Sequence, residues 1–166
     1  MLTLVDVIRA EKSDVKIGPW KTGSVLASAF PINKQKRFPS SSAWSWRVVE
    51  FTALDRCFRV LIRLNTDISS YSSILAVSGG SVSQIICHHE LHLSHRNWHC
   101  HMVSGNVLTV MPGVLRDTSR MRVYEAAPSA ANDITFSVDA DTALAVAAKR
   151  FRFAAPDETP AQQRLI

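Results

Sequence analysis

WSWRVVEFTALDRCFRVLIRLN, residues 44–65, decides the fold because it holds two alternating apolar runs separated by a short polar break. A two-residue turn at Asp55 and Arg56 would fold this stretch into an antiparallel hairpin. One face of that hairpin is then apolar, with Ala53 opposite Phe58, Phe51 opposite Val60 and Val49 opposite Ile62. We expect the opposite face to be half solvated, because it carries Trp46, Glu50, Thr52, Arg59 and Arg63.

The chain beyond this hairpin continues the same alternation. Gly79 and Gly80 tolerate the positive φ angles of a tight turn, which predicts a second hairpin around them. The runs CHHELHL and WHCHMVSG flank a polar cluster at 94–97, which predicts a third hairpin. Short strands are expected at 121–124 and 134–138. The sequence therefore predicts an antiparallel β-meander of about five to seven strands.

Two helices are expected to pack against this sheet, which makes the fold class α+β. Thr3 is a good N-cap for a short helix whose apolar residues recur at helical spacing through Glu11. Asp139 or Asp141 would begin a second helix that runs to about Arg152, where basic residues complement the helix dipole. The C-terminal helix closes the predicted core.

One domain accounts for the whole chain. A length of 166 residues fits a single core. We expect the domain to span residues 1–153, with a basic irregular arm at 12–42 laid over the sheet, because that segment is rich in Lys, Gly, Pro and Ser. Residues 154–166, with two prolines, are expected to form a flexible tail.

Charge and cysteine content narrow the class of protein. The net charge of +5 favours anionic partners such as RNA or an acidic protein. Cys57, Cys87 and Cys100 are odd in number and lack CxxC spacing, which argues for a reducing compartment and hence for the cytoplasm. The first 14 residues do not resemble a secretory signal, and no apolar run is long enough to cross a membrane.

All six histidines lie within fourteen residues, which predicts a site on the third hairpin. An even-length connection at 94–97 places His92 opposite His99 and Glu90 opposite His101, and it separates polar from apolar side chains. The polar face then carries His88, Glu90, His92, His99 and His101. The apolar face carries Cys87, Leu91, Leu93, Trp98, Cys100 and Met102, with only His89 out of character.

General acid–base chemistry on RNA is the leading hypothesis for this histidine face. Imidazole titrates near neutral pH, so one ring can remove a proton from a ribose hydroxyl while another protonates the leaving oxygen. The hypothesis is a small basic RNA-directed protein, a metal-independent endoribonuclease of the toxin or defence type, without a cofactor. His92 and His99 would be acid and base, and His101 with Glu90 the orienting pair. Phosphate-binding candidates are Arg116, Arg120, Lys34, Lys36 and Arg37.

Three alternatives stay open. Zinc or another divalent transition metal could be bound by His92, His99, His101 and Glu90, since such metals accept imidazole and carboxylate ligands. The chain could instead be a non-catalytic inhibitor or interaction module whose basic surface meets an acidic partner. Finally, the rings could form ordinary hydrogen bonds within a half-polar sheet face.

Overall fold

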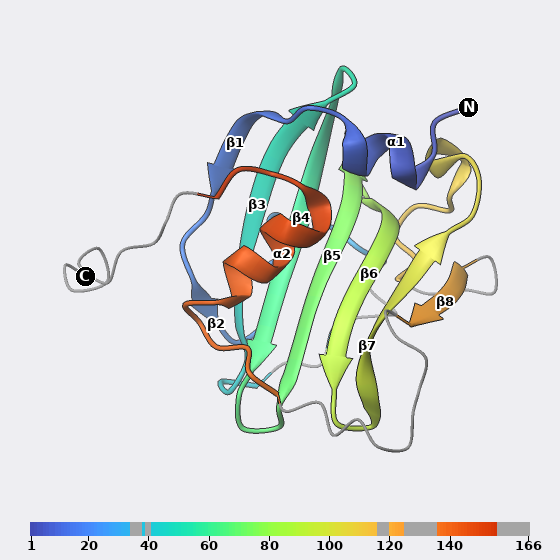
Figure 1. The fold of residues 1–166 in the computed structure, drawn as a ribbon. Helices are drawn as coiled ribbons and strands as arrows, with labels where there is room; N and C mark the ends of the chain where they lie inside the picture. The colour runs from blue at the N-terminus through green and yellow to red at the C-terminus, as the bar shows by residue number, and fades with distance from the viewer. Residues whose placement is uncertain (34–37, 39–40, 116–119, 125–135, 156–166) are drawn as a thin grey trace.

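The computed structural model describes residues 1–33, 38, 41–115, 120–124 and 136–155, apart from the side chains of residues 95 and 96. Within these ranges the chain forms an eight-stranded antiparallel sheet and two α-helices (Figure 1). The elements are α1 (Leu4–Arg9), β1 (Ser13–Ile17), β2 (Lys21–Thr22), β3 (Ser45–Ala53), β4 (Arg56–Asn65), β5 (Ser70–Ser78), β6 (Gln84–His92), β7 (His95–Val103), the 3₁₀ turn η2 (Val107–Thr109), β8 (Arg120–Tyr124) and α2 (Ala143–Phe151).

The sheet is a meander, as the sequence predicts. Its strand order is β1-β3-β4-β5-β6-β7-β8, and β2 also pairs with β3. From β3 onward every strand pairs with the next strand along the chain, because short connections favour antiparallel neighbours. The site hairpin, β6–β7, therefore lies toward one edge of the sheet, with only β8 beyond it among the described residues (Figure 1).

The segment 12–42 is not wholly irregular, which corrects the predicted arm and raises the strand number to eight in the described part of the chain. β1 and β2 lie in this segment and pair with β3. Their side chains are mostly polar and exposed, so the sequence lacks the alternating apolar residues by which a strand is recognised. Asp14, with a φ of 52°, marks an irregularity in the β1–β3 register that also breaks the alternation.

The first hairpin forms, but its register is two residues from the predicted one. Phe51 pairs with Phe58 and Val49 with Val60, so the turn consists of Leu54 and Asp55. Both turn residues have positive φ angles, of 50° and 56°. Leu-Asp lacks the Asn-Gly signal usual for such a turn. A shift of two residues leaves every side chain on its predicted face, because side chains alternate with a period of two.

The main core lies between one face of the sheet and α2, which crosses β4 and β5 (Figure 1). Leu144 and Phe151 of α2 are buried there against apolar side chains of the central strands. Tyr71 joins the two layers, because its hydroxyl donates to the carbonyl oxygen of Ala143 at 3.2 Å. At the end of the sheet, Thr3 caps α1 through a reciprocal capping box with Asp6, as predicted from the sequence.

The opposite face of the sheet is half solvated near the turn at 54–55, as expected, because Glu50, Thr52 and Arg59 are partly exposed there. Farther from that turn the expectation is wrong, because Trp46 and Arg63 are buried. Phe30 and Phe38 from the arm pack with Trp46, Leu61 and other apolar residues in a second, smaller core. The arm therefore does lie over the sheet, as expected. Arg63 is only 6% exposed, and its guanidinium lies 4.1 Å from the ring centroid of Trp44. Burial lowers the pKa of Arg63 to about 10.

Other local predictions differ from the structure or fall outside it. Five residues, 79–83, connect β5 to β6 where a tight Gly79–Gly80 turn was expected. Residues 136–138, the described part of the strand expected at 134–138, are not in a strand. Of the expected tail, 156–166 lie outside the described residues. No helix in the described ranges is long and apolar enough to cross a membrane.

Candidate metal centre

The hairpin formed by β6 and β7 turns at Leu93 and Ser94, two residues earlier than the centre of the predicted turn. Glu90 pairs with His99 and His88 with His101, which again shifts the predicted register by two residues. The paired residues keep their predicted faces. Leu93, predicted on the apolar face, instead lies in the turn and is 64% exposed. Between the Glu90–His99 and His92–His95 pairs, β7 uses two residues more than β6. The strand ladder is therefore irregular between the inner residues and the hairpin tip.

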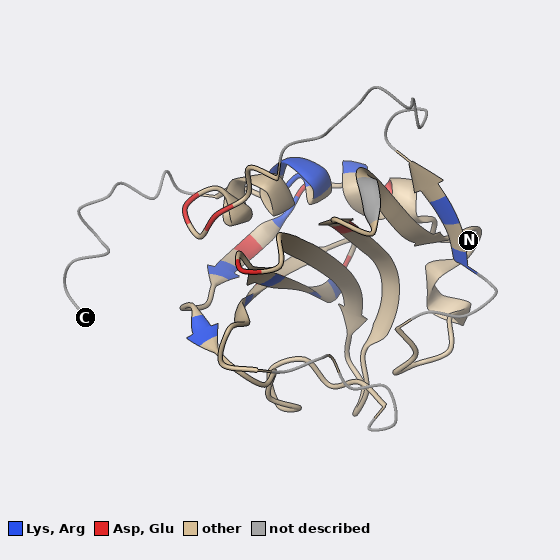
Figure 2. Ribbon diagram, turned by 90° about the horizontal axis from the view of Figure 1, so that it is seen from below, with Lys and Arg blue, Asp and Glu red and all other residues tan. Residues whose placement is uncertain are grey.

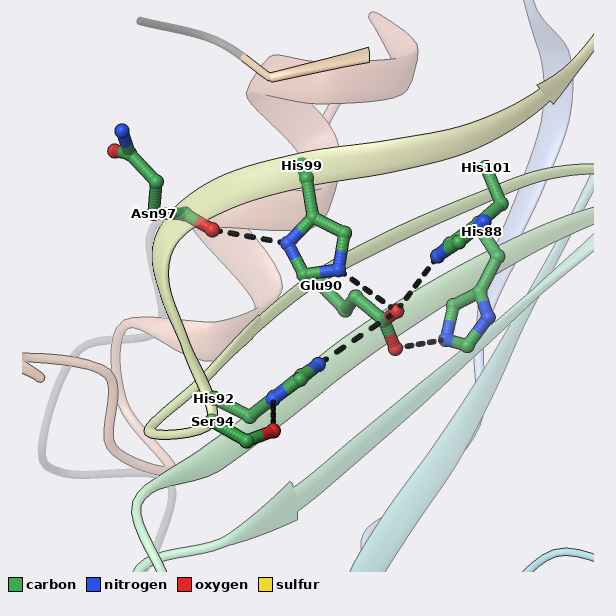
Figure 3. Close-up of polar contacts among 7 residues, drawn as sticks. All are labelled: His88, Glu90, His92, Ser94, Asn97, His99 and His101. Carbon is green, nitrogen blue, oxygen red and sulfur yellow. Dashed lines mark hydrogen bonds and ion pairs between the residues drawn. The ribbon is translucent and has the colours of Figure 1, made fainter. Parts of the chain in front are cut away.

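The structure brings together the five side chains that alternation assigns to one side of this hairpin (Figure 3). We call this set, which is His88, Glu90, His92, His99 and His101, the histidine face. The opposite side packs into the main core. We call its side chains, which are Cys87, His89, Trp98, Cys100 and Met102, the core face.

The carboxylate of Glu90 is the centre of the histidine face. Its Oε1 lies 3.0 Å from Nε2 of His99 and 3.2 Å from Nε2 of His101. Nε2 of His92 is farther from the same oxygen, at 3.8 Å. The other oxygen, Oε2, faces Nε2 of His88 at 3.1 Å. Four imidazoles therefore aim the same ring nitrogen at one carboxylate (Figure 3).

Most of this cluster is removed from solvent. The side chains of His99, Glu90 and His101 are 0%, 6% and 9% exposed. Glu90 is also the only Asp, Glu, Lys or Arg residue in β5 and β6, and Figure 2 shows these central strands almost free of charged residues. Burying an ionised carboxylate costs several kcal/mol unless a cation compensates it. The four imidazoles around Glu90 supply the polar contacts that a carboxyl group at this depth requires.

The orientation of His99 fixes which of its nitrogens can bind a cation. Its Nδ1 lies 2.9 Å from the backbone carbonyl oxygen of Asn97. A carbonyl only accepts hydrogen bonds, so Nδ1 carries the proton and donates. In the neutral ring, Nε2 then presents its lone pair to Oε1 of Glu90. Two acceptors face each other at 3.0 Å, an arrangement that a shared proton or a metal ion resolves.

Three ligand atoms, one each from Glu90, His99 and His101, lie within 4.8 Å of one another. A transition metal binds imidazole and carboxylate at about 2.0–2.2 Å, so neighbouring ligand atoms around it are about 3.0–3.5 Å apart. The distances of 3.0 and 3.2 Å between Oε1 and the two ring nitrogens match that spacing. Two imidazoles and one carboxylate can therefore hold a divalent ion with a coordination position left for another group.

All five residues of the histidine face were predicted from the sequence to share one side of the hairpin, but His88 alone was given no role. His88 contacts the carboxylate oxygen that faces away from the other rings, and it is buried. Its contact suits an imidazole that orients a ligating carboxylate. The signal was present in the sequence, since His88 precedes Glu90 by two residues and so shares its face.

The predicted phosphate-binding residues are not assembled around this cluster in the described part of the chain. Arg120 is buried, and its Nη2 donates to the backbone carbonyl oxygens of Ile85 and Val114 at 2.9 and 2.8 Å. These bonds give Arg120 a place in the fold. The other candidates lie outside the described residues; they are Arg116, Lys34, Lys36 and Arg37.

The core face includes one histidine and two cysteines, whose side chains contact other residues of the core. The ring of His89 stacks on Trp98, with centroids 4.7 Å apart. Arg150 of α2 donates a hydrogen bond from Nη2 to Sγ of Cys100 at 2.8 Å. The neighbouring Cys100 thiol and burial raise the pKa of Cys87, which keeps that thiol protonated. The exception noticed in the sequence, His89, is thus an aromatic partner in the core.

The protein is an antiparallel β-meander that carries a buried cluster on one hairpin. Within that cluster, one carboxylate and two imidazoles have the spacing of metal ligands. Comparisons of this chain with protein-family models, curated proteins and solved structures found no match.

Proposed function

We propose that the protein binds one divalent transition-metal ion through Glu90, His99 and His101. The observation that carries this proposal is the convergence of their three ligand atoms within 4.8 Å, in a cluster less than one-tenth exposed. Three protein ligands leave a position open, and an open position is typical of metal sites that bind water or substrate. The proposal is a metal centre able to act on a bound group, as metalloenzyme sites do.

The shared orientation of the rings supports a metal. Oε1 of Glu90 has three imidazole Nε2 atoms within 3.8 Å. A divalent ion at this point would receive a lone pair from neutral rings, and the carboxylate would offset part of its charge. Without a metal, rings protonated at Nε2 would instead donate hydrogen bonds to the carboxylate, so metal content distinguishes the two arrangements.

The ligand types favour zinc or ferrous iron. Both metals accept imidazole nitrogen and carboxylate oxygen, and two histidines with one carboxylate are a frequent ligand set for non-haem Fe(II). The hydrogen bond from His99 Nδ1 to the carbonyl oxygen of Asn97 supplies the outer support that metal-binding imidazoles usually have. The three cysteines form no disulfide, which supports the proposed cytoplasmic location.

The endoribonuclease hypothesis remains a prediction and receives less support. A general acid or base must reach the proton that it transfers, within about 3.2 Å or through one water. His99 is fully buried, and both of its ring nitrogens already face protein oxygen atoms. A metal-independent role for His99 would need the hairpin to open. The proposed metal centre uses His99 where it lies.

Elemental analysis of purified protein tests the proposal directly. We expect one zinc or iron per chain after purification without chelator, or after loading the apo-protein with either metal. Glu90→Gln and His99→Ala should each lower metal affinity at least 100-fold, more than the 10–100-fold typical of an outer-shell change.

Glu50→Gln is the matched control, because Glu50 is a carboxylate of the same sheet face that pairs with Arg59 at 2.7 Å. It should bind metal like the wild type. A wild-type protein that takes up neither metal while retaining its fold by circular dichroism contradicts the proposal.

A further inference from the structure

The histidine face has a graded exposure to solvent. His99, His88 and His101 are 0%, 5% and 9% exposed, whereas the side chain of His92 is 23% exposed. His92 is also the farthest of the four rings from Glu90, at 3.8 Å. His92, which lies next to Ser94 at the hairpin tip, is therefore the ring of the histidine face most exposed to solvent (Figure 3).

The backbone around His92 differs from that of the inner residues. His92 ends β6 and directly precedes the two-residue turn, beyond the irregular step in the β6–β7 ladder. Glu90 and His99 form a regular pair on the inner side of that step. A residue at a strand end can reorient with less disturbance to the ladder than one within it.

Two polar groups lie beside the two nitrogens of the His92 ring. Oγ of Ser94 lies 2.8 Å from Nδ1 of His92, while Nε2 of the same ring points toward Glu90 at 3.8 Å. The ring also meets His99 edge to face, with centroids 5.2 Å apart. His92 is therefore next to two of the three residues of the proposed metal site.

We propose that His92 is the exchangeable ligand of the metal centre, occupying the open coordination position from the solvent side and leaving it to admit the metal or a small ligand. This inference rests on the proposed metal site. Glu90, His99 and His101 retain the ion, while His92 controls exchange. With His92 displaced, the vacated position accepts water or a small anion such as azide, because the remaining ligands are buried behind it.

Cobalt-loaded protein tests this assignment, since Co²⁺ reports its ligands through visible absorption. We expect His92→Ala to retain one Co²⁺ per chain but to release it to excess chelator at least about tenfold faster than the wild type. It should also show an azide-dependent change of the visible spectrum at lower azide concentration. Ser94→Ala should change both quantities in the same direction and by less.

Thr66→Ala is the control for Ser94→Ala, because it removes a hydroxyl from the neighbouring exposed β4–β5 turn. It should behave like the wild type. Unchanged cobalt release and azide response in His92→Ala would overturn the exchangeable-ligand assignment while leaving the metal site intact. Loss of stoichiometric cobalt in His92→Ala, at wild-type circular dichroism, would overturn it by making His92 a retaining ligand. Absence of cobalt binding in the wild type would remove the proposed function as well.

Discussion

Histidine side chains have different roles on the two sides of the β6–β7 hairpin. On the core face, His89 is one aromatic ring among others, stacked on Trp98 and edge-on to Tyr71. On the histidine face, four rings aim Nε2 at a single carboxylate. Both sides are largely buried, so burial alone does not distinguish them. The difference lies in Glu90, whose carboxyl group faces all four rings of the histidine face.

The largest effect on stability is expected from the core face. Trp98→Ala removes the stacking partner of His89 and an edge contact with Tyr71, whose ring centroid is 5.6 Å away. We expect the free energy of unfolding to fall by about 3 kcal/mol, at the low end of the range for truncated core aromatics, because Trp98 is partly buried against the main core. Denaturant unfolding of the apo-protein measures it. Metal stoichiometry should stay at one; its loss at a temperature where the variant is folded would show that the two sides are not separable.

A slightly smaller effect is expected when metal is removed from the histidine face. Free metal at 100 times its Kd stabilises the native state by about 2.7 kcal/mol. For a chain of this size we expect chelation to lower the Tm by about 5–10 °C. Thermal unfolding with and without EDTA measures the shift. Trp98→Ala should keep the EDTA-dependent decrease in Tm, and Glu90→Gln should lose it. Equal decreases in both variants would show that metal binding does not depend on Glu90.

The bond between Arg150 and Cys100 is expected to contribute less. Arg150→Ala deletes the hydrogen bond from the guanidinium to Sγ of Cys100 that joins α2 to the core face. We expect a loss of about 1 kcal/mol in the free energy of unfolding. Chemical denaturation measures it, with Lys149→Ala on the exposed side of the same helix as control. A faster release of bound metal in Arg150→Ala would instead connect the core face to the metal centre.

The smallest effect is expected at the start of α2, and it depends on pH. Hydrogen bonds from the Thr142 side chain and backbone lower the pKa of Asp139 below its ordinary value of 3.8. The ionised carboxylate therefore stabilises the fold above that value, and its contribution is lost as pH falls through the lower, folded-state pKa. Asp139→Asn should lower the Tm by about 2 °C at pH 7 and by less at pH 2.5. A decrease of the same size at both pH values would exclude the carboxylate as the cause.

Alternation along the strands predicted the faces of the sheet better than its pairings. In the β3–β4 and β6–β7 hairpins the paired residues keep their predicted faces, although both registers move by two residues. Alternation with a period of two determines which face a side chain is on, but it does not determine the position of the turn. Leu54–Asp55 and Leu93–Ser94 are not the Gly- or Asn-rich turns that sequence rules recognise. Turn chemistry therefore limits what the sequence can specify about register.

The candidate site shows the same division. Clustering and alternation identify Glu90, His99 and His101, and they place His88 beside them. Separating retaining ligands from an exchangeable one needs distances and exposures, which depend on the irregular step of the ladder. Residues 13–22 were missed as strands because an edge strand that pairs mainly through its backbone carries little hydrophobic signal.

The two extra residues of β7 between the Glu90–His99 and His92–His95 pairs also make the hairpin tip a separate unit for redesign. A ladder that is already interrupted there does not transmit a change of loop length into the paired residues behind it. Loops of different length grafted between His92 and His95 would then change the surroundings of His92 while Glu90 and His99 keep their pairing. The same inner side chains could in this way be combined with hairpin tips of different size and polarity.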